Sequence, residues 1–156
     1  MQKILSVSLL FSLVSSTLYG NVSIVSTSYR EQVQVNESGE KVKVWIHTEK
    51  VIPGTIIKYV NRLDNDNEST RRNFVIRSTI PKNMIYIDNS AQCTSSCAVR
   101  YSVDGGMTFH YPSKLYVKKA GKHHLAKASD YTNIRWRLDL LEKNSLNSVE
   151  YKARLK

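Results

Sequence analysis

Apolar and polar side chains alternate along most of the chain beyond residue 40. In the segment 41–49, for example, Val42, Val44 and Ile46 fall on one side of an extended backbone. A period of two residues is typical of a strand with one buried and one solvated face, and no sustained helical period is present. The pattern predicts strands at 41–49, 55–63, 74–80, 84–87, 99–103, 134–140 and 149–155.

Regularly spaced short strands without helices are typical of all-β folds. Residues that favour turns separate the strands, among them Pro53-Gly54, the run 64–67 and Asp104-Gly105-Gly106. We therefore expect an immunoglobulin-like antiparallel β-sandwich of about seven to nine strands. A closed barrel is the alternative fold.

The segments 134–140 and 149–155 show the clearest alternation, and a short turn separates them. We expect them to form a hairpin, with Trp136 opposite Ala153 or shifted by two residues, because such a slip preserves the two faces. Trp136 falls on the apolar face and is predicted to lie in the core. The wet face is predicted to carry one cationic patch, formed by Arg135, Arg137, Lys152 and Arg154.

Residues 1–20 have the features of a secretory signal peptide: one lysine, an apolar run over 4–14, and small residues that end at Gly20. The alternative is a membrane anchor, which needs about 20 mostly apolar residues. Hydroxyl side chains at 15–17 interrupt the run before that length is reached. We expect cleavage, one domain over 21–156, no transmembrane segment after cleavage, and an extracytoplasmic location in the periplasm or at the cell surface.

Basic residues outnumber acidic ones by 23 to 13, and the net charge of +10 favours acidic partners. No acidic residue lies between Asp104 and Asp130, a stretch rich in lysine. This stretch and the wet sheet face form a candidate surface for a polyanion: Lys114, Lys118, Lys119, Lys122, Lys127, Arg135, Arg137, Lys152 and Arg154. The alternative is a solvated surface, which is the usual role of a run of charges.

Cys93 and Cys97 are the two cysteines of the chain. In an oxidising compartment their spacing favours a disulfide that closes a small loop, with free thiols or a metal site as alternatives. Three intervening residues are too few to join two packed sheets, so we exclude the inter-sheet bridge of immunoglobulin domains.

Two other groups of residues are candidates for metal binding. Asp64, Asp66 and Glu68 alternate like the start of a calcium loop, but the run lacks the glycine and the final acidic ligand of an EF-hand. A solvated turn is therefore the expected structure. His123 and His124 allow a copper or nickel site, although two adjacent histidines are more often exposed loop residues. We assign no metal, no cofactor and no catalytic residue.

Five segments share their order and spacing with a known bacterial domain. They are VIPGTIIKYVNR (51–62), IPKNMIYI (80–87), VRYSVDGGMTF (99–109), YTNIRWRLDLL (131–141) and SVEYKARL (148–155). Over about 41–155 the chain resembles the bacterial conserved-repeat domain that is catalogued as the eleventh domain of unknown function. This resemblance implies an immunoglobulin-like module of surface and envelope proteins, and it transfers no catalytic residues.

These features favour a secreted, non-enzymatic module of the cell envelope that acts as a structural or interaction domain, with a protein or an envelope polymer as its partner. The alternative is a binding protein for an acidic envelope polymer, which would use the lysine-rich stretch and the basic sheet face. No nucleic acid is expected as a partner in vivo. Trp45 lies on the polar side of its strand, where either a neighbouring segment such as 22–35 covers it or it contacts a glycan or protein.

Overall fold

The computed structural model describes residues 22–48 and 50–156, so the predicted signal peptide lies outside the described residues. The described part of the chain is all-β and contains no α-helix, only two short 3₁₀ turns, η1 (Pro112–Lys114) and η2 (Ala128–Asp130). The strands are β1 (Val22–Val35), β2 (Lys41–His47), β3 (Ile56–Asn65), β4 (Arg71–Thr79), β5 (Met84–Tyr86), β6 (Gln92–Cys93), β7 (Cys97–Ser102), β8 (Tyr116–Lys119), β9 (Lys122–Leu125), β10 (Asn133–Leu141) and β11 (Ser145–Leu155). The predicted all-β class is confirmed, although the strands outnumber the seven to nine expected. No helix in these two described segments is long and apolar enough to cross a membrane.

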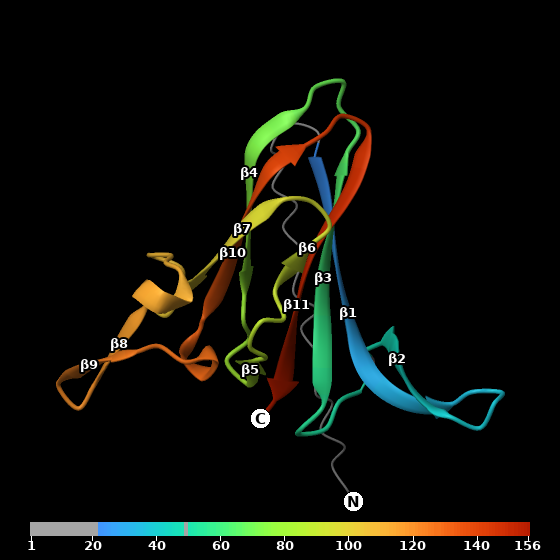
Figure 1. The fold of residues 1–156 in the computed structure, drawn as a ribbon, viewed down its shortest axis with the longest axis horizontal. Helices are drawn as coiled ribbons and strands as arrows, with labels where there is room; N and C mark the ends of the chain where they lie inside the picture. Colours follow the sequence, from blue (N-terminus) through green and yellow to red (C-terminus); the bar gives the residue numbers. More distant parts are fainter. Residues whose placement is uncertain (1–21, 49) are drawn as a thin grey trace, which may run out of the picture.

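The strands form two main sheets and a separate ribbon, all with antiparallel pairing (Figure 1). The larger sheet has the order β2-β1-β3-β11-β5, and β6 also pairs with β11. The smaller sheet has the order β4-β10-β7, while β8 and β9 pair with each other. Within the described residues neither main sheet closes on itself, so the chain does not form the closed barrel considered as the alternative. The β1–β2 and β8–β9 hairpins project from opposite sides of the packed sheets (Figure 1).

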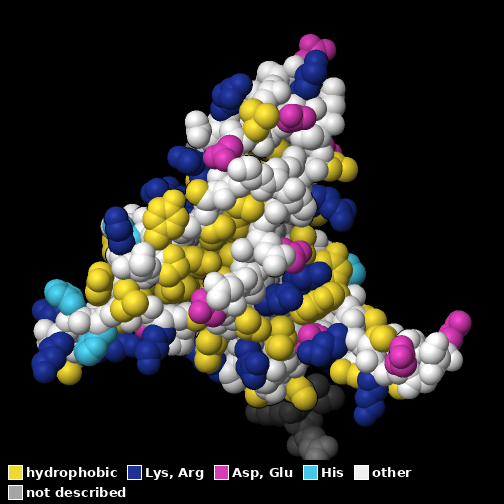
Figure 2. Space-filling view, in the orientation of Figure 1, with side chains coloured by type: hydrophobic (Ala, Val, Ile, Leu, Met, Phe, Trp, Pro, Cys, Tyr) yellow, Lys and Arg dark blue, Asp and Glu magenta, His cyan; other side chains and the backbone are white. Residues whose placement is uncertain are grey.

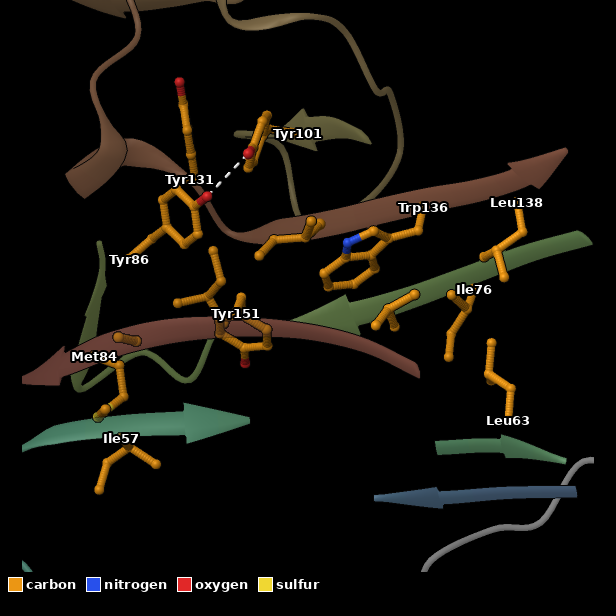
Figure 3. Packing of buried hydrophobic residues seen from close by; sticks show 14 of the residues in the cluster. Ile57, Leu63, Ile76, Met84, Tyr86, Tyr101, Tyr131, Trp136, Leu138 and Tyr151 are labelled. Carbon is orange, nitrogen blue, oxygen red and sulfur yellow. Dashed lines mark hydrogen bonds between the residues drawn. The ribbon is translucent and has the colours of Figure 1, made fainter. Parts of the chain in front are cut away.

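Apolar side chains from both sheets meet in one core (Figure 3). The ring centres of Trp136 on β10 and Tyr151 on β11 lie 6.2 Å apart. Trp136 is fully buried, as predicted. At one end of this core, the hydroxyls of Tyr86 and Tyr101 are joined by a hydrogen bond of 2.9 Å (Figure 3). Burying a large apolar side chain contributes about 1.5–3 kcal/mol, so this shared core holds the two sheets face to face.

The last two strands do not pair with each other, and the predicted hairpin is wrong. β10 lies between β4 and β7, where Trp136 is opposite Val99 of β7. β11 lies between β3 and β5 in the other sheet, where Ala153 is opposite Ile57 of β3. Alternation determines which face of a strand is buried, but it does not determine which strand lies beside it. The inner faces of β10 and β11 match the prediction, whereas their neighbours do not.

A buried asparagine holds the turn at which the chain passes from β10 to β11. Asn65, the last residue of β3, is fully buried. Its Nδ2 donates hydrogen bonds to the carbonyl oxygens of Leu141 at 3.2 Å and Glu142 at 2.8 Å. The same amide also donates to the Ser69 carbonyl at 3.2 Å, and its Oδ1 accepts a bond from Asn67 at 2.9 Å. An amide therefore organises the turn at 66–70 and attaches it to the crossing between the sheets.

Cys93 and Cys97 form the predicted disulfide, with Cα atoms 6.6 Å apart. Cys93 belongs to β6, which pairs with β11 of the larger sheet, and Cys97 belongs to β7 of the smaller sheet. The bridge therefore joins strands of the two sheets, and the expectation that three intervening residues are too few to join two sheets is wrong. That expectation assumed a bridge through the core. This disulfide instead lies at the edge where the chain crosses between the sheets and a short step is enough.

Residues 22–35, which show no clear alternation, form the long strand β1. β1 pairs with β3 along 22–30 and with β2 along 29–35. It therefore lies beside Trp45 in the sheet and does not cover its ring. Two lysines contact the ring instead: the Nζ atoms of Lys58 and Lys152 lie 4.8 and 5.3 Å from its centre. These cation–π contacts occupy the side chain that was a candidate for partner binding.

Candidate anion-binding face

The basic residues of β10 and β11 lie on different sides of the molecule. Arg135 and Arg137 alternate with buried residues and point outward from the smaller sheet. Lys152 and Arg154 alternate with buried residues of β11 and point outward from the larger sheet, beyond the shared core. The single cationic patch predicted from these four residues is therefore wrong, because the two strands belong to different sheets.

The lysine-rich stretch forms the exposed β8–β9 ribbon and the two short turns that flank it. The predicted lysines here are all exposed: Lys114 in η1, Lys118 and Lys119 in β8, Lys122 in β9, and Lys127 before η2. Lys119 forms an ion pair with Asp130, with 2.7 Å between Nζ and Oδ1. In Figure 2 basic side chains gather on this ribbon, together with histidine, and along β4. The ribbon is thus a second basic surface, separate from the residues of β11.

Three arginines form a row across the smaller sheet. Arg135 on the central strand β10 is directly opposite Arg77 on β4 and Arg100 on β7. We call these three residues the arginine row. Like charges directly opposite each other destabilise a sheet. None of the three forms an ion pair with a carboxylate in the described part of the chain. The row therefore places three positive charges side by side, and no ion pair in the described part of the chain balances them.

Aromatic rings hold the guanidinium groups of the arginine row. The guanidinium carbons of Arg77 and Arg135 lie 5.3 and 4.7 Å from the centre of the Phe109 ring. The guanidinium carbon of Arg100 lies 4.8 Å from the centre of the Tyr111 ring. An aromatic face attracts a guanidinium group and leaves N–H donors at its edge for an anion. Because the rings already restrict these side chains, less conformational freedom is lost when an anion binds.

A pocket of about 190 Å³ lies beside the arginine row. It is lined by Val75, Ala98, Arg100, Arg135 and Arg137. Arg137 takes part because it is the next outward residue on β10, opposite Val75 and Ala98. It contacts Asp139 at 3.7 Å, but both side chains are about half exposed, so this ion pair is weak. We call the arginine row together with Arg137 the arginine face.

The pKa of Arg135 is shifted by its position in the middle of this face. Burial lowers it, and repulsion from Arg100, Arg77 and Arg137 adds to the effect. Arginine nevertheless stays protonated in proteins, so the group keeps its charge. Both causes disfavour the charged form, and a bound anion would offset both by supplying an opposite charge.

The candidate metal residues do not come together. In the ribbon His123 is opposite Lys118 and His124 is opposite Val117. Successive residues of a strand point to opposite faces, so the two imidazoles lie on different sides of the ribbon. Across residues 22–48 and 50–156, no group of three or more His, Cys, Asp or Glu is placed to hold a metal ion.

Sequence reasoning identified Arg135 and Arg137 but missed Arg77 and Arg100. Each missed arginine lies within a predicted strand, 74–80 or 99–103, so an arginine in each of three strands was a usable signal. Their sequence spacing does not align them, because only the pairing of β4 and β7 with β10 places them in one row.

No protein-family model matches the chain, and no curated protein or solved structure matches it. Its function is therefore inferred from the arginine face and the fold that positions it.

Proposed function

We propose that this chain is a secreted, non-enzymatic module of the cell envelope that binds an acidic polymer through the arginine face. The arginine row carries the proposal: three guanidinium groups lie on adjacent strands and have no carboxylate partner in the described residues. The fold that we propose is an immunoglobulin-like sandwich. Two antiparallel sheets around one core support it, as does the resemblance to the bacterial conserved-repeat domain.

A polymer matches the shape of this face better than a small anion does. Neighbouring strands lie about 4.8 Å apart, so the arginine row spans about 10 Å across the sheet. A polyanion that crosses the strands meets several guanidinium groups at once. Each exposed ion pair contributes about 0.2–1 kcal/mol, so binding needs several of them together. The ribbon lysines extend the positive surface, because Tyr111 stacks on Arg100 and leads directly into η1 and Lys114.

An extracytoplasmic location, in the periplasm or at the cell surface, is part of the proposal. The Cys93–Cys97 disulfide supports it, because disulfides persist in oxidising compartments and are rare in the cytosol. The signal peptide predicted over 1–20 agrees with such a location.

Salt-dependent binding to defined polyanions tests the proposal. We expect the exported, purified protein to bind a polyuronate or dextran sulfate at low ionic strength, and to lose affinity as salt screens the charges. Replacing both Arg100 and Arg135 by glutamine should raise the Kd about tenfold, which equals about 1.4 kcal/mol. This is about 0.7 kcal/mol for each guanidinium, within the range for exposed ion pairs.

A matched variant separates the arginine face from net charge. Replacing Lys152 and Arg154 by glutamine removes the same charge from the outer face of the larger sheet. If the arginine face is the site, this variant keeps a Kd within about twofold of the parent, because its charges lie on the far side of the core. Equal weakening by both double variants would show that only net charge governs binding. No binding by the parent at low salt would refute the polymer proposal.

A further inference from the structure

The first half of β1 has a strand on one side only. β3 lies beside 22–30, but β2 joins β1 only along 29–35, in the curled half of the strand (Figure 1). The hydrogen bond from the Thr48 amide to the Ser28 carbonyl marks the point where this second neighbour begins. Within the described residues, the segment 22–27 therefore forms an edge of the larger sheet. Backbone N–H and C=O groups along such an edge are available to another strand.

This edge lacks the features that normally prevent strands from pairing between molecules. Residues 22–28 read VSIVSTS and contain no charge, no proline and no glycine. Ile24 and Val25 are 40% and 60% exposed. Edge strands are usually protected by charged side chains, proline or bulges. An uncharged segment of high strand propensity on an edge is therefore a site for strand addition.

The outer edge of the smaller sheet provides a contrast within the same molecule. It is formed by β4, which carries Arg72 and Arg77. Asn73 has a φ of 52°, and the pairing with β10 omits it while the register is the same on either side, so the strand is locally irregular at this point. The arginines oppose pairing of β4 with another copy of itself. Of these two edges, the β1 edge is the one suited to self-association.

We propose that residues 23–27 pair with the same segment of a second copy of the chain, in antiparallel orientation around a two-fold axis at Val25. Residues opposite each other in an antiparallel pair point to the same face. Val25 then meets Val25 of the second copy on the outer face, and Ile24 meets Ser26 on the inner face. The larger sheets of the two copies become one continuous sheet, and both copies contribute the same surface.

Charge makes this edge the preferred place for two copies to meet. Two chains of net charge +10 repel each other wherever their basic faces approach. The residue beside Val25 on β3 is Arg62. In the dimer, the two Arg62 positions are separated by three strand spacings, or about 14 Å. This distance exceeds the Debye length of about 8 Å at physiological salt, so their repulsion is largely screened.

Engineered cysteines test the register directly. In an antiparallel pair, opposite Cα atoms lie about 4.5–5.5 Å apart, which a disulfide can span. Both native cysteines are already paired, so no native thiol competes. We expect Val25→Cys to form a disulfide-linked dimer under mild oxidation. Val33→Cys is the matched control, because Val33 is 55% exposed on the same strand but lies outside the proposed contact.

Sedimentation equilibrium of the whole exported chain measures the association itself. The parent should show a monomer–dimer equilibrium, and Val25→Lys should raise the dimer Kd by at least about tenfold, because it places two charges face to face. Val33→Lys should leave the Kd unchanged. A parent that stays monomeric over the whole concentration range would overturn the proposal. Equal cross-linking of the two cysteine variants would overturn it as well. The arginine face plays no part in this contact, so this result and the polyanion test are independent.

Discussion

Replacing Asn65 by alanine removes the amide that joins three segments of the chain. Its Nδ2 donates to carbonyl oxygens of Ser69, before β4, and of Leu141 and Glu142, where the chain leaves β10. Alanine can make none of these bonds, and water does not reach the buried contact with the Leu141 carbonyl. We expect the crossing between the two sheets to loosen, and the free energy of unfolding to fall.

The size of the effect follows from the surroundings of each carbonyl. The bond to Leu141 is buried, so its loss leaves an unpaired acceptor, at a cost of about 1–3 kcal/mol. Ser69 and Glu142 are exposed residues whose carbonyls can bind water instead. The Nδ2 group has two hydrogens, so the contacts with these two carbonyls together amount to about one further bond, which costs about 0.5–1.5 kcal/mol. The total of about 1.5–4.5 kcal/mol is a large part of the 5–15 kcal/mol that usually stabilises a domain.

Urea denaturation followed by tryptophan fluorescence measures this loss, and the midpoint of thermal unfolding should fall by about 10 °C. Asn83→Ala is the matched control, because Asn83 is an exposed asparagine and surface substitutions usually change stability by less than about 0.5 kcal/mol. If Asn65→Ala differs from this control by no more than that amount, the amide does not hold the crossing.

Three further predictions concern other parts of the fold. Replacing Cys93 and Cys97 by serine should lower stability by about 2 kcal/mol, the chain-entropy value for so short a loop, while near-UV circular dichroism stays native; loss of that spectrum would contradict this. Hydrogen bonds hold the pKa of Asp104 well below its usual range. The stabilisation that ionised Asp104 contributes to the fold is therefore fully present above the unfolded-state pKa of about 3.9, and it is lost as the pH falls through the lower pKa of the folded state. The variant D104N should not show this loss in acid denaturation. R135K keeps the positive charge, and with it the repulsion in the arginine row, but weakens the contact with the Phe109 ring, whereas R135Q removes the charge. R135K should therefore be less stable than R135Q by about 0.5–1 kcal/mol at low salt. Equal stabilities would argue against the repulsion.

Strand positions and buried faces are the part of this fold that the sequence predicts well. The alternation around Trp136 and Tyr151 reflects a core that tolerates only apolar side chains, so it is visible in the residues themselves. The sequence pattern does not predict β1, β8 and β9, because most of their residues lie outside the core. Much of β1 and the whole ribbon are exposed or half-exposed on both faces, so burial imposes no alternation on them.

Strand neighbours are the part that the sequence does not predict. A short turn after residue 141 is compatible with a hairpin and equally with a crossing to the other sheet. The crossing depends on contacts between distant segments, such as the bonds from Asn65 to the carbonyls at 141 and 142. The arginine row depends on the same pairing, since Arg77 and Arg135 are 58 residues apart in sequence but opposite each other in the sheet. The pattern of residues within a single strand does not indicate such contacts between distant segments.

Side chains on the inner face of the smaller sheet stabilise each other, whereas the arginines on its outer face repel each other. On the inner side of β10, Trp136 and its neighbours are fully buried and hold the strand in one position. On the outer side, like charges lie opposite each other on this central strand, whose register is held by the close packing of its inner face. The backbone therefore fixes the spacing of the arginines, and Phe109 and Tyr111 restrict their guanidinium groups. Local violations of folding rules are expected where a surface serves binding. A rigid scaffold that holds repelling charges together is preorganised for an anion, because binding removes repulsion without reordering the site.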